Sequence, residues 1–94
     1  MFRFDDELKV YLHRDPVDFR CGINSLSILV EQAMQLSPMA PALFVFGNRR
    51  RDRIKILGWE RNGFWLLLKR LEAGDRFVWP DSKTAVVTLS VELL

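Results

Sequence analysis

Two strand-like runs that flank a dense cluster of arginines constrain the fold of this chain more than any other feature. The runs at 42–46 and 54–59 are rich in branched and aromatic residues, which favour β-strands. The segment 48–55, which joins the two runs and includes the start of the second, holds five cationic side chains. The short separation predicts a β-hairpin with the arginines at its tip. Each guanidinium offers a planar fork of N–H donors, so this tip is suited to binding phosphate oxygens.

Length and composition limit the class of protein. A chain of 94 residues predicts a single domain, 1–94. Its 49% hydrophobic and 28% charged residues are typical of a globular protein. No apolar run approaches the ~20 residues that cross a bilayer, and residues 1–7 lack the apolar stretch of a secretion signal. A lone Cys21 cannot form an internal disulfide, which agrees with the cytoplasmic location that we expect.

Positive charge is concentrated in the central third of the sequence. Residues 49–76 hold nine Lys/Arg against four Asp/Glu, whereas residues 1–48 hold four against six. The net charge of the whole chain is only +2. Because a local field governs the binding of a polyanion, the central segment is where such a partner is expected to bind.

The remaining elements predict an α+β fold. Residues 8–12 alternate as a strand does, and residues 22–36 have the 3.6-residue period of a helix that Pro38 would end. Asn62-Gly63 predicts a tight turn between strands 53–60 and 64–71. Further strands are expected at 77–79 and 84–89, and Ser90 could cap a short helix from Val91 that the chain ends before completing. We therefore expect a mainly antiparallel meander of about five to six strands with one main helix.

Strand parity indicates that both faces of this sheet are apolar. In the strand 53–60, Leu57 and Trp59 share one face, while Ile54 and Ile56 share the other. One helix covers only one face, so the second needs another layer: a C-terminal helix, a curled sheet or a partner chain. This pattern predicts self-association, a homo-oligomer.

Residues for catalysis are few. One His13 and one Cys21 cannot supply a zinc site, and we interpret them as a surface or turn histidine and a small buried thiol. Asp15 and Asp18 flank a proline turn; they could pair on a metal, but a position before the helix is the ordinary reading. Neither a phosphate-binding glycine loop nor a cofactor motif occurs in the sequence, so no cofactor is expected. A small nuclease is disfavoured for the same reasons.

Several aromatic residues lie in or beside the basic segment. Such residues could stack on the bases of single-stranded nucleic acid, but filling the core of a small sheet is the commoner role. They are Trp59, Phe64, Trp65, Phe77 and Trp79.

Motifs along the whole chain resemble one known family. The most specific are the arginine cluster with its following strand, the Lys69-Arg70-Leu71-Glu72 segment and the Phe77-Val78-Trp79-Pro80 end. They are joined by Asp18-Phe19-Arg20-Cys21-Gly22 and by Asn62-Gly63-Phe64. The sequence is similar to the TnpB-type accessory proteins encoded by the second reading frame of IS66 insertion sequences.

This resemblance implies a non-enzymatic protein that assists DNA transposition while a separate transposase cuts and joins the strands. The chain departs from the family pattern at Cys21, where a basic residue is common, at Gly58, where an aromatic is usual, and in the longer turn at Gly74-Asp75. Family members usually continue through a C-terminal helix after the segment that appears here as Leu89-Ser90, so this chain resembles a shortened form.

The leading hypothesis is that the basic hairpin binds DNA or the transposase–DNA complex, with Asp52 orienting its arginine neighbours. The alternative is a protein-interaction subunit whose hairpin docks an acidic surface of the transposase without touching DNA. The expected nucleic-acid-binding residues are Arg49, Arg50, Arg51, Arg53, Lys55, Lys69 and Arg70.

Overall fold

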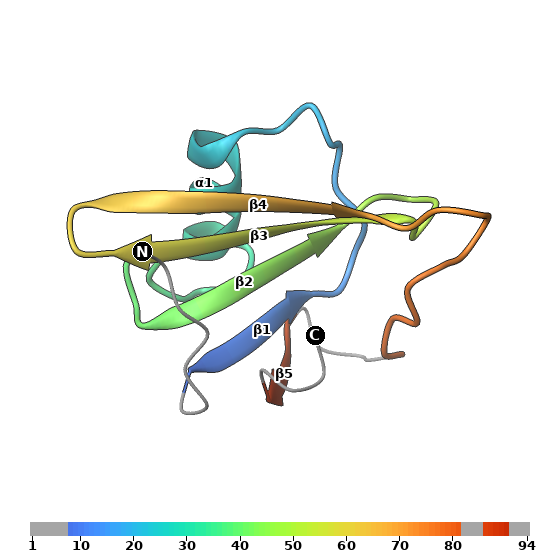
Figure 1. Ribbon diagram of the computed structural model, residues 1–94. Coiled ribbons are helices and arrows are strands. Elements are labelled where there is room, and N and C mark those ends of the chain that lie inside the picture. The colour runs from blue at the N-terminus through green and yellow to red at the C-terminus, as the bar shows by residue number, and fades with distance from the viewer. Residues whose placement is uncertain (1–7, 82–85, 91–94) are drawn as a thin grey trace.

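The computed structural model describes residues 8–81 and 86–90. Within these residues the chain forms one α-helix and one five-stranded sheet (Figure 1). The elements in chain order are β1 (Lys9–His13), α1 (Ile23–Gln32), β2 (Ala42–Gly47), β3 (Arg53–Glu60), β4 (Gly63–Arg70) and β5 (Val86–Ser90).

The sheet is mixed, with the strand order β4-β3-β2-β1-β5. β1 and β2 run parallel, with Lys9 opposite Ala42 and Leu12 opposite Val45, and every other pair is antiparallel. The prediction of an antiparallel meander was therefore wrong at this pair. Parallel neighbours need a long crossover, and the chain between β1 and β2, which contains α1, supplies it.

The last strand lies at the opposite edge of the sheet from β4. The strand expected at 84–89 is found as β5, and it pairs antiparallel with β1, so that Leu12 lies opposite Val87. The strand expected at 77–79 does not form. Its backbone and side chains bond to other segments instead: the Phe77 N–H donates to the Arg51 carbonyl at 2.6 Å. The helix expected from Val91 lies outside the described residues.

The helix is shorter than its periodicity predicts. α1 begins after Gly22 and ends at Gln32, whereas the period predicts helix as far as residue 36. Gln35 adopts the left-handed region with a φ of 55°, so the helix does not continue to Pro38. Leu26 and Val30 are fully buried, and Met34 beyond the helix is nearly so. This stripe packs against one face of the sheet, as the period predicted.

A core forms on each face of the sheet. On the helix side, Leu26 and Val30 pack with Phe44, Phe46 and Leu57. A second core on the other face is made by Val10, Leu12, Leu43, Val45, Ile54 and Ile56. Those that are fully buried, such as Val10, Leu43 and Phe44, each stabilise the fold by about 1.5–3 kcal/mol.

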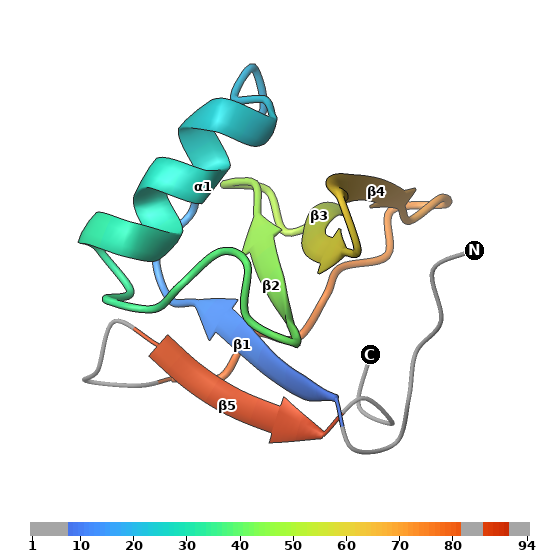
Figure 2. The ribbon, with the colours of Figure 1, turned by 90° about the vertical axis from the view of Figure 1, so that its left-hand side faces the viewer.

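The layer on the second face comes from the segment 71–81. This segment leaves the end of β4 and turns beneath the sheet, away from α1 (Figures 1 and 2). Phe77 and Trp79 from it pack against the second core. The irregular segment 71–81, which we call the strap, therefore covers this face within the described residues. The sequence pattern predicts a helix, a curled sheet or a partner chain in that place.

The β3–β4 hairpin forms with its turn one residue earlier than expected. Glu60 lies opposite Gly63, so the two loop residues are Arg61 and Asn62. The positive φ that a tight turn needs falls on Arg61, at 54°, and not on Gly63.

Candidate nucleic-acid interface

Residues 48–52 form the turn between β2 and β3, and we call them the arginine turn. β2 and β3 pair up to Gly47 and Ile54, which confirms that the cluster lies at the tip of a hairpin. Asn48 organises the turn: its Oδ1 accepts from the Asp52 and Arg53 amides, each at 3.2 Å. An asparagine commonly closes a loop in this way, so the sequence carried a signal for this role.

The sequence predicts that Asp52 orients its arginine neighbours, but its carboxylate is hydrogen-bonded to Asn48. The Asn48 amide donates to the Asp52 carboxylate at 2.6 Å. This bond, helped by the charges of Arg50 and Arg53, lowers the pKa of Asp52 from its ordinary value. Asp52 therefore shapes the turn chiefly through Asn48.

Arg53 and Arg70 are direct neighbours across the β3–β4 pair. Both side chains are exposed and share one face of the sheet, since opposite residues of a pair lie on the same side. Arg70 is also paired with Glu72, with 2.7 Å between Nη2 and Oε1. Arg49 and Arg50 on the adjacent turn are exposed as well, so four of the predicted arginines gather at one end of the sheet.

Lys69 and Arg76 extend this basic end. Lys69 is exposed and lies opposite Ile54, which places it on the other face from Arg53 and Arg70. The bond from Phe77 to the turn carbonyl brings the exposed Arg76 beside the arginine turn. Sequence reasoning missed Arg76, because nothing local indicated that the strap returns to the turn.

Arg51 is directed into the protein and away from the exposed arginines. Its guanidinium lies 4.4 Å from the centre of the Trp79 ring, and its Nη2 donates to the Arg14 carbonyl at 3.2 Å. Its Nη1 is buried without a hydrogen-bond partner, and the residue has a positive φ of 59°. Partial burial lowers the pKa of Arg51, although a guanidinium stays charged at neutral pH.

Lys55 is also engaged within the protein. Its ammonium donates to the carbonyls of Phe19 and Cys21, both at 2.8 Å, and lies 5.0 Å from the Phe19 ring centre. The structure thus separates Arg51 and Lys55 from the other five predicted residues. Together they fasten the loop after β1 to the hairpin, where the Val17 amide also donates to the Gly47 carbonyl.

A hollow of about 410 Å³ lies between this loop and the arginine turn. Pro16, Val17, Asp18 and Phe19 form one wall, and Asn48, Arg49 and Arg50 form the other. Asp18 is paired with Arg20, so its charge is largely balanced within the loop. The hollow therefore has two exposed cationic side chains, Arg49 and Arg50, on its rim.

The aromatic residues act mainly in packing. Trp59 and Phe64 meet edge to face, with 4.9 Å between ring centres, and Trp79 supports Arg51 while its indole N–H donates to the His13 carbonyl. Trp65 is 44% exposed, but it lies opposite Gly58, toward the far end of the hairpin. A stacking surface beside the arginine turn is not formed by these residues.

The candidate catalytic residues are not brought together. His13 is buried at the end of β1, directly before a bend, with its Nδ1 2.7 Å from the Asp15 carbonyl oxygen. Of the expected surface or turn histidine, the surface position was therefore wrong. Asp15 and Asp18 pair with Arg14 and Arg20, and Gly22 at the start of α1 has no side-chain cap. Across 8–81 and 86–90, no group of three or more His, Cys, Asp or Glu side chains could hold a metal ion.

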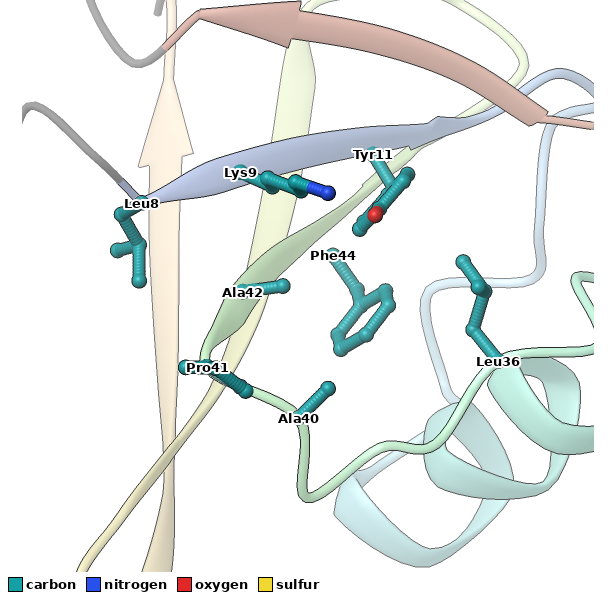
Figure 3. A pocket seen from close by; sticks show the side chains of 8 residues that line it. All are labelled: Leu8, Lys9, Tyr11, Leu36, Ala40, Pro41, Ala42 and Phe44. Atoms are coloured by element: carbon teal, nitrogen blue, oxygen red, sulfur yellow. The ribbon is translucent and has the colours of Figure 1, made fainter.

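A larger hollow of about 470 Å³ lies at the other end of β1 and β2 (Figure 3). Its lining is apolar except for Lys9 and Tyr11, which extend from β1 over Ala42 and Phe44. It is remote from the arginine turn, which follows the opposite end of β2, and it adds no anion-binding group to the basic end.

A family model described as IS66 Orf2-like protein matches residues 8–94. The chain belongs to this family. The family consists of accessory proteins of insertion-sequence transposition, so the coarse role expected from the sequence is supported.

Two relatives of this IS66 Orf2-like protein come from Sinorhizobium fredii. The uncharacterised protein y4hO is 34% identical over 83 residues, which cover 88% of this chain and 71% of the relative. The uncharacterised protein y4jC is 36% identical over 85 residues, covering 90% and 72%. No solved structure matches the chain. None of the helices in the described residues is long and apolar enough to cross a membrane.

Proposed function

We propose that this IS66 Orf2-like protein assists transposition by binding DNA, alone or with the transposase, through the basic end of its sheet. The proposed contact residues are the five exposed members of the predicted set and the added Arg76. They are Arg49, Arg50, Arg53, Lys69, Arg70 and Arg76.

The observation that carries this proposal is the direct opposition of Arg53 and Arg70. Like charges facing each other across a strand pair destabilise a sheet, and Glu72 contacts only one of the two. An anion placed between the guanidinium groups would reverse that repulsion. Arg49 and Arg50 on the adjoining turn provide further donors for a phosphate backbone, to which arginine binds well.

In this proposal Arg51 and Lys55 act indirectly. They were expected to contact DNA, but their bonds to the Arg14, Phe19 and Cys21 carbonyls favour a positioning role. They fix the turn so that its exposed neighbours point outward. Loss of either would weaken DNA binding through the conformation of the turn and not through a lost phosphate contact.

The salt dependence of binding to duplex DNA tests this division. If four to five phosphates are neutralised, log Kobs should fall with log[salt] with a slope of about −3.6 to −4.5. The double change Arg49→Gln and Arg50→Gln should flatten that slope by about 1.8. The control is Arg61→Asn, which removes one exposed arginine from the β3–β4 turn, at the opposite end of β3, and accommodates its positive φ.

A slope that stays unchanged in the Arg49/Arg50 variant would overturn the proposed contact surface. A flattening of about 0.9 in Arg61→Asn, the amount for one arginine, would show that binding follows total charge and not this end of the sheet. Both variants should retain the wild-type circular dichroism spectrum, because all three side chains are exposed.

The second candidate function is docking of the same basic end on an acidic surface of the transposase without DNA contact. A gel shift with the purified chain alone, beside a pull-down of the transposase in the presence of nuclease, separates the two. Binding that survives nuclease, together with no shift of free DNA, would favour protein docking.

The proposal includes a non-enzymatic role, a cytoplasmic location where bacterial DNA is found, and self-association. No cofactor and no small-molecule substrate are part of it.

A further inference from the structure

The outer edge of β4 is unpaired within the described residues. β4 is the first strand in the sheet order and spans Gly63–Arg70. Its first six residues carry no charge, and three of its apolar side chains are exposed: Trp65 by 44%, Leu67 by 36% and Leu68 by 63%. Sheet proteins usually protect a long apolar edge with charges, proline or a bulge. β4 has two cations, both at its end.

The backbone of β4 presents a defined set of outward hydrogen-bonding groups. Glu60 and Gly63 flank a two-residue turn, and the Leu71 amide donates to the Asp52 carbonyl at 2.8 Å, so odd-numbered residues bond toward β3. Alternation then directs the even-numbered amides and carbonyls outward. These belong to Phe64, Leu66, Leu68 and Arg70.

A second copy of β4 can pair antiparallel with this edge. In one register, the outward amides and carbonyls of all four residues form hydrogen bonds with the second copy. When Leu67 lies opposite Leu67 of the second copy, Leu66 pairs with Leu68, and Phe64 pairs with Arg70. Shifting the register by two residues in either direction leaves outward groups of β4 without a β4 partner. The edge is thus complementary to itself about a twofold axis at Leu67.

The side chains agree with this register. It places Arg70 opposite Phe64, and Lys69 opposite Trp65, so each cation meets an aromatic ring of the other copy. No two like charges lie directly opposite within the paired strands. The exposed Leu67 and Leu68 meet leucines of the second copy, which removes apolar surface from water on both faces.

We propose that two copies of the chain associate through their β4 edges to form one continuous ten-stranded sheet. This inference rests on the proposed self-association and specifies its surface. Association through β4 needs no DNA, so it is tested in the absence of DNA. The self-complementary register favours a second copy over an unrelated strand as the occupant of the edge.

Sedimentation of the full chain at concentrations from about 1 to 100 µM should show a monomer–dimer equilibrium. Leu68→Pro removes an outward amide from each copy but no bond to β3, and proline is tolerated on a strand edge. It should weaken the dimer by at least about tenfold. Leu68→Val, which keeps the amide, is the matched control and should dimerise nearly as the wild type does.

Cysteine cross-linking tests the register. In a chain whose native Cys21 is replaced by alanine, Leu67→Cys should form an intermolecular disulfide on mild oxidation. The facing Cα atoms of such a non-hydrogen-bonded pair lie about 4.5 Å apart, within disulfide range. Trp65→Cys should not cross-link, because the two copies of residue 65 are offset by four positions, about 13 Å along the strands.

A monomer at 100 µM would overturn the proposal. A Leu68→Pro protein that keeps its strand content and still dimerises as the wild type does would exclude the β4 edge. Cross-linking of Trp65→Cys as fast as Leu67→Cys would exclude the register. The salt slope on DNA is a separate measurement, so failure here leaves the proposed DNA-binding surface to its own test.

Discussion

The Arg51 guanidinium stacks on Trp79, 4.4 Å from the ring centre, although 28 positions separate the two residues in the sequence. The contact joins the arginine turn to the strap 71–81. Trp79 continues the connection by donating from its indole N–H to the His13 carbonyl at 3.1 Å, at the end of β1. One arginine of the basic cluster thus links three segments and holds the turn that carries the exposed arginines.

A double-mutant cycle of Arg51→Met and Trp79→Leu should reveal this coupling. Each single change should lower the free energy of unfolding by about 1–3 kcal/mol, because a stack and a buried hydrogen bond are lost together. The coupling energy should be about 0.5–2 kcal/mol. Urea unfolding followed by fluorescence and circular dichroism measures it, and strictly additive effects would contradict the stacking.

Gly47 provides an independent test of the same contact. A Cβ added there would lie 2.5 Å from the Arg51 Nη1 and 3.2 Å from the Trp79 ring. Gly47→Ala should therefore displace the guanidinium and cost about 1–3 kcal/mol of stability, as overpacking does. In an Arg51→Met background the cost should shrink, because only the ring contact remains. An equal cost in both backgrounds would locate the strain elsewhere.

The sequence predicted what depends on local pattern. The hairpin that bears the arginines, the β3–β4 hairpin and the buried stripe of α1 all follow from periodicity and turn chemistry over a few residues. Pairing between strands that are distant in sequence does not follow from such local patterns. The parallel β1–β2 pair is an exception that could have been predicted, because a strand, a helix and a strand in succession form a crossover unit.

The division of the basic cluster could not be predicted from composition. Arg49 and Arg51 are alike in sequence context, yet Arg51 has a positive φ and faces Trp79 while Arg49 is exposed. That difference depends on where the strap 71–81 crosses the sheet. The same long-range contact brings Arg76 to the turn, which no local signal indicated.

Lys55 and Arg53 form a matched pair for separating support from binding. They lie two positions apart on the same face of β3, but only Lys55 bonds to the loop carbonyls of Phe19 and Cys21. Lys55→Met should destabilise the protein by about 1–3 kcal/mol, because charge-assisted bonds to both carbonyls are lost. Arg53→Met should change stability by less than about 0.5 kcal/mol, as an exposed substitution does.

The effects on DNA binding should be reversed. Arg53→Met should flatten the log–log salt slope by about 0.9, whereas Lys55→Met should leave the slope nearly unchanged in the folded protein. Equal stability losses in the two variants would argue against the bonds of Lys55. If Lys55→Met flattened the salt slope and Arg53→Met did not, Lys55 and not Arg53 would be a DNA-contacting residue.

Asp18 gives the chain an acid-sensitive ion pair. Its carboxylate accepts from the Arg20 side chain and, at 2.9 Å, from the Arg20 amide. The side-chain bond is the larger cause, and together they lower the pKa of Asp18 to about 2. Because the folded pKa lies below the ordinary value of about 3.9, the pair contributes stability above pH ~4 and loses it as the pH falls toward 2.

Titration of the Asp18 carboxyl by NMR should therefore show a midpoint near 2 in the wild type. Arg20→Gln should raise that midpoint toward about 3.9, because the charged donor is gone. The thermal midpoint of Asp18→Asn should fall slightly below that of the wild type at pH 6 and approach it by pH 2, since protonation removes the same charge. The stability difference should be small because the pair is exposed to solvent. A wild-type midpoint near 4 would show that the pair does not persist in solution.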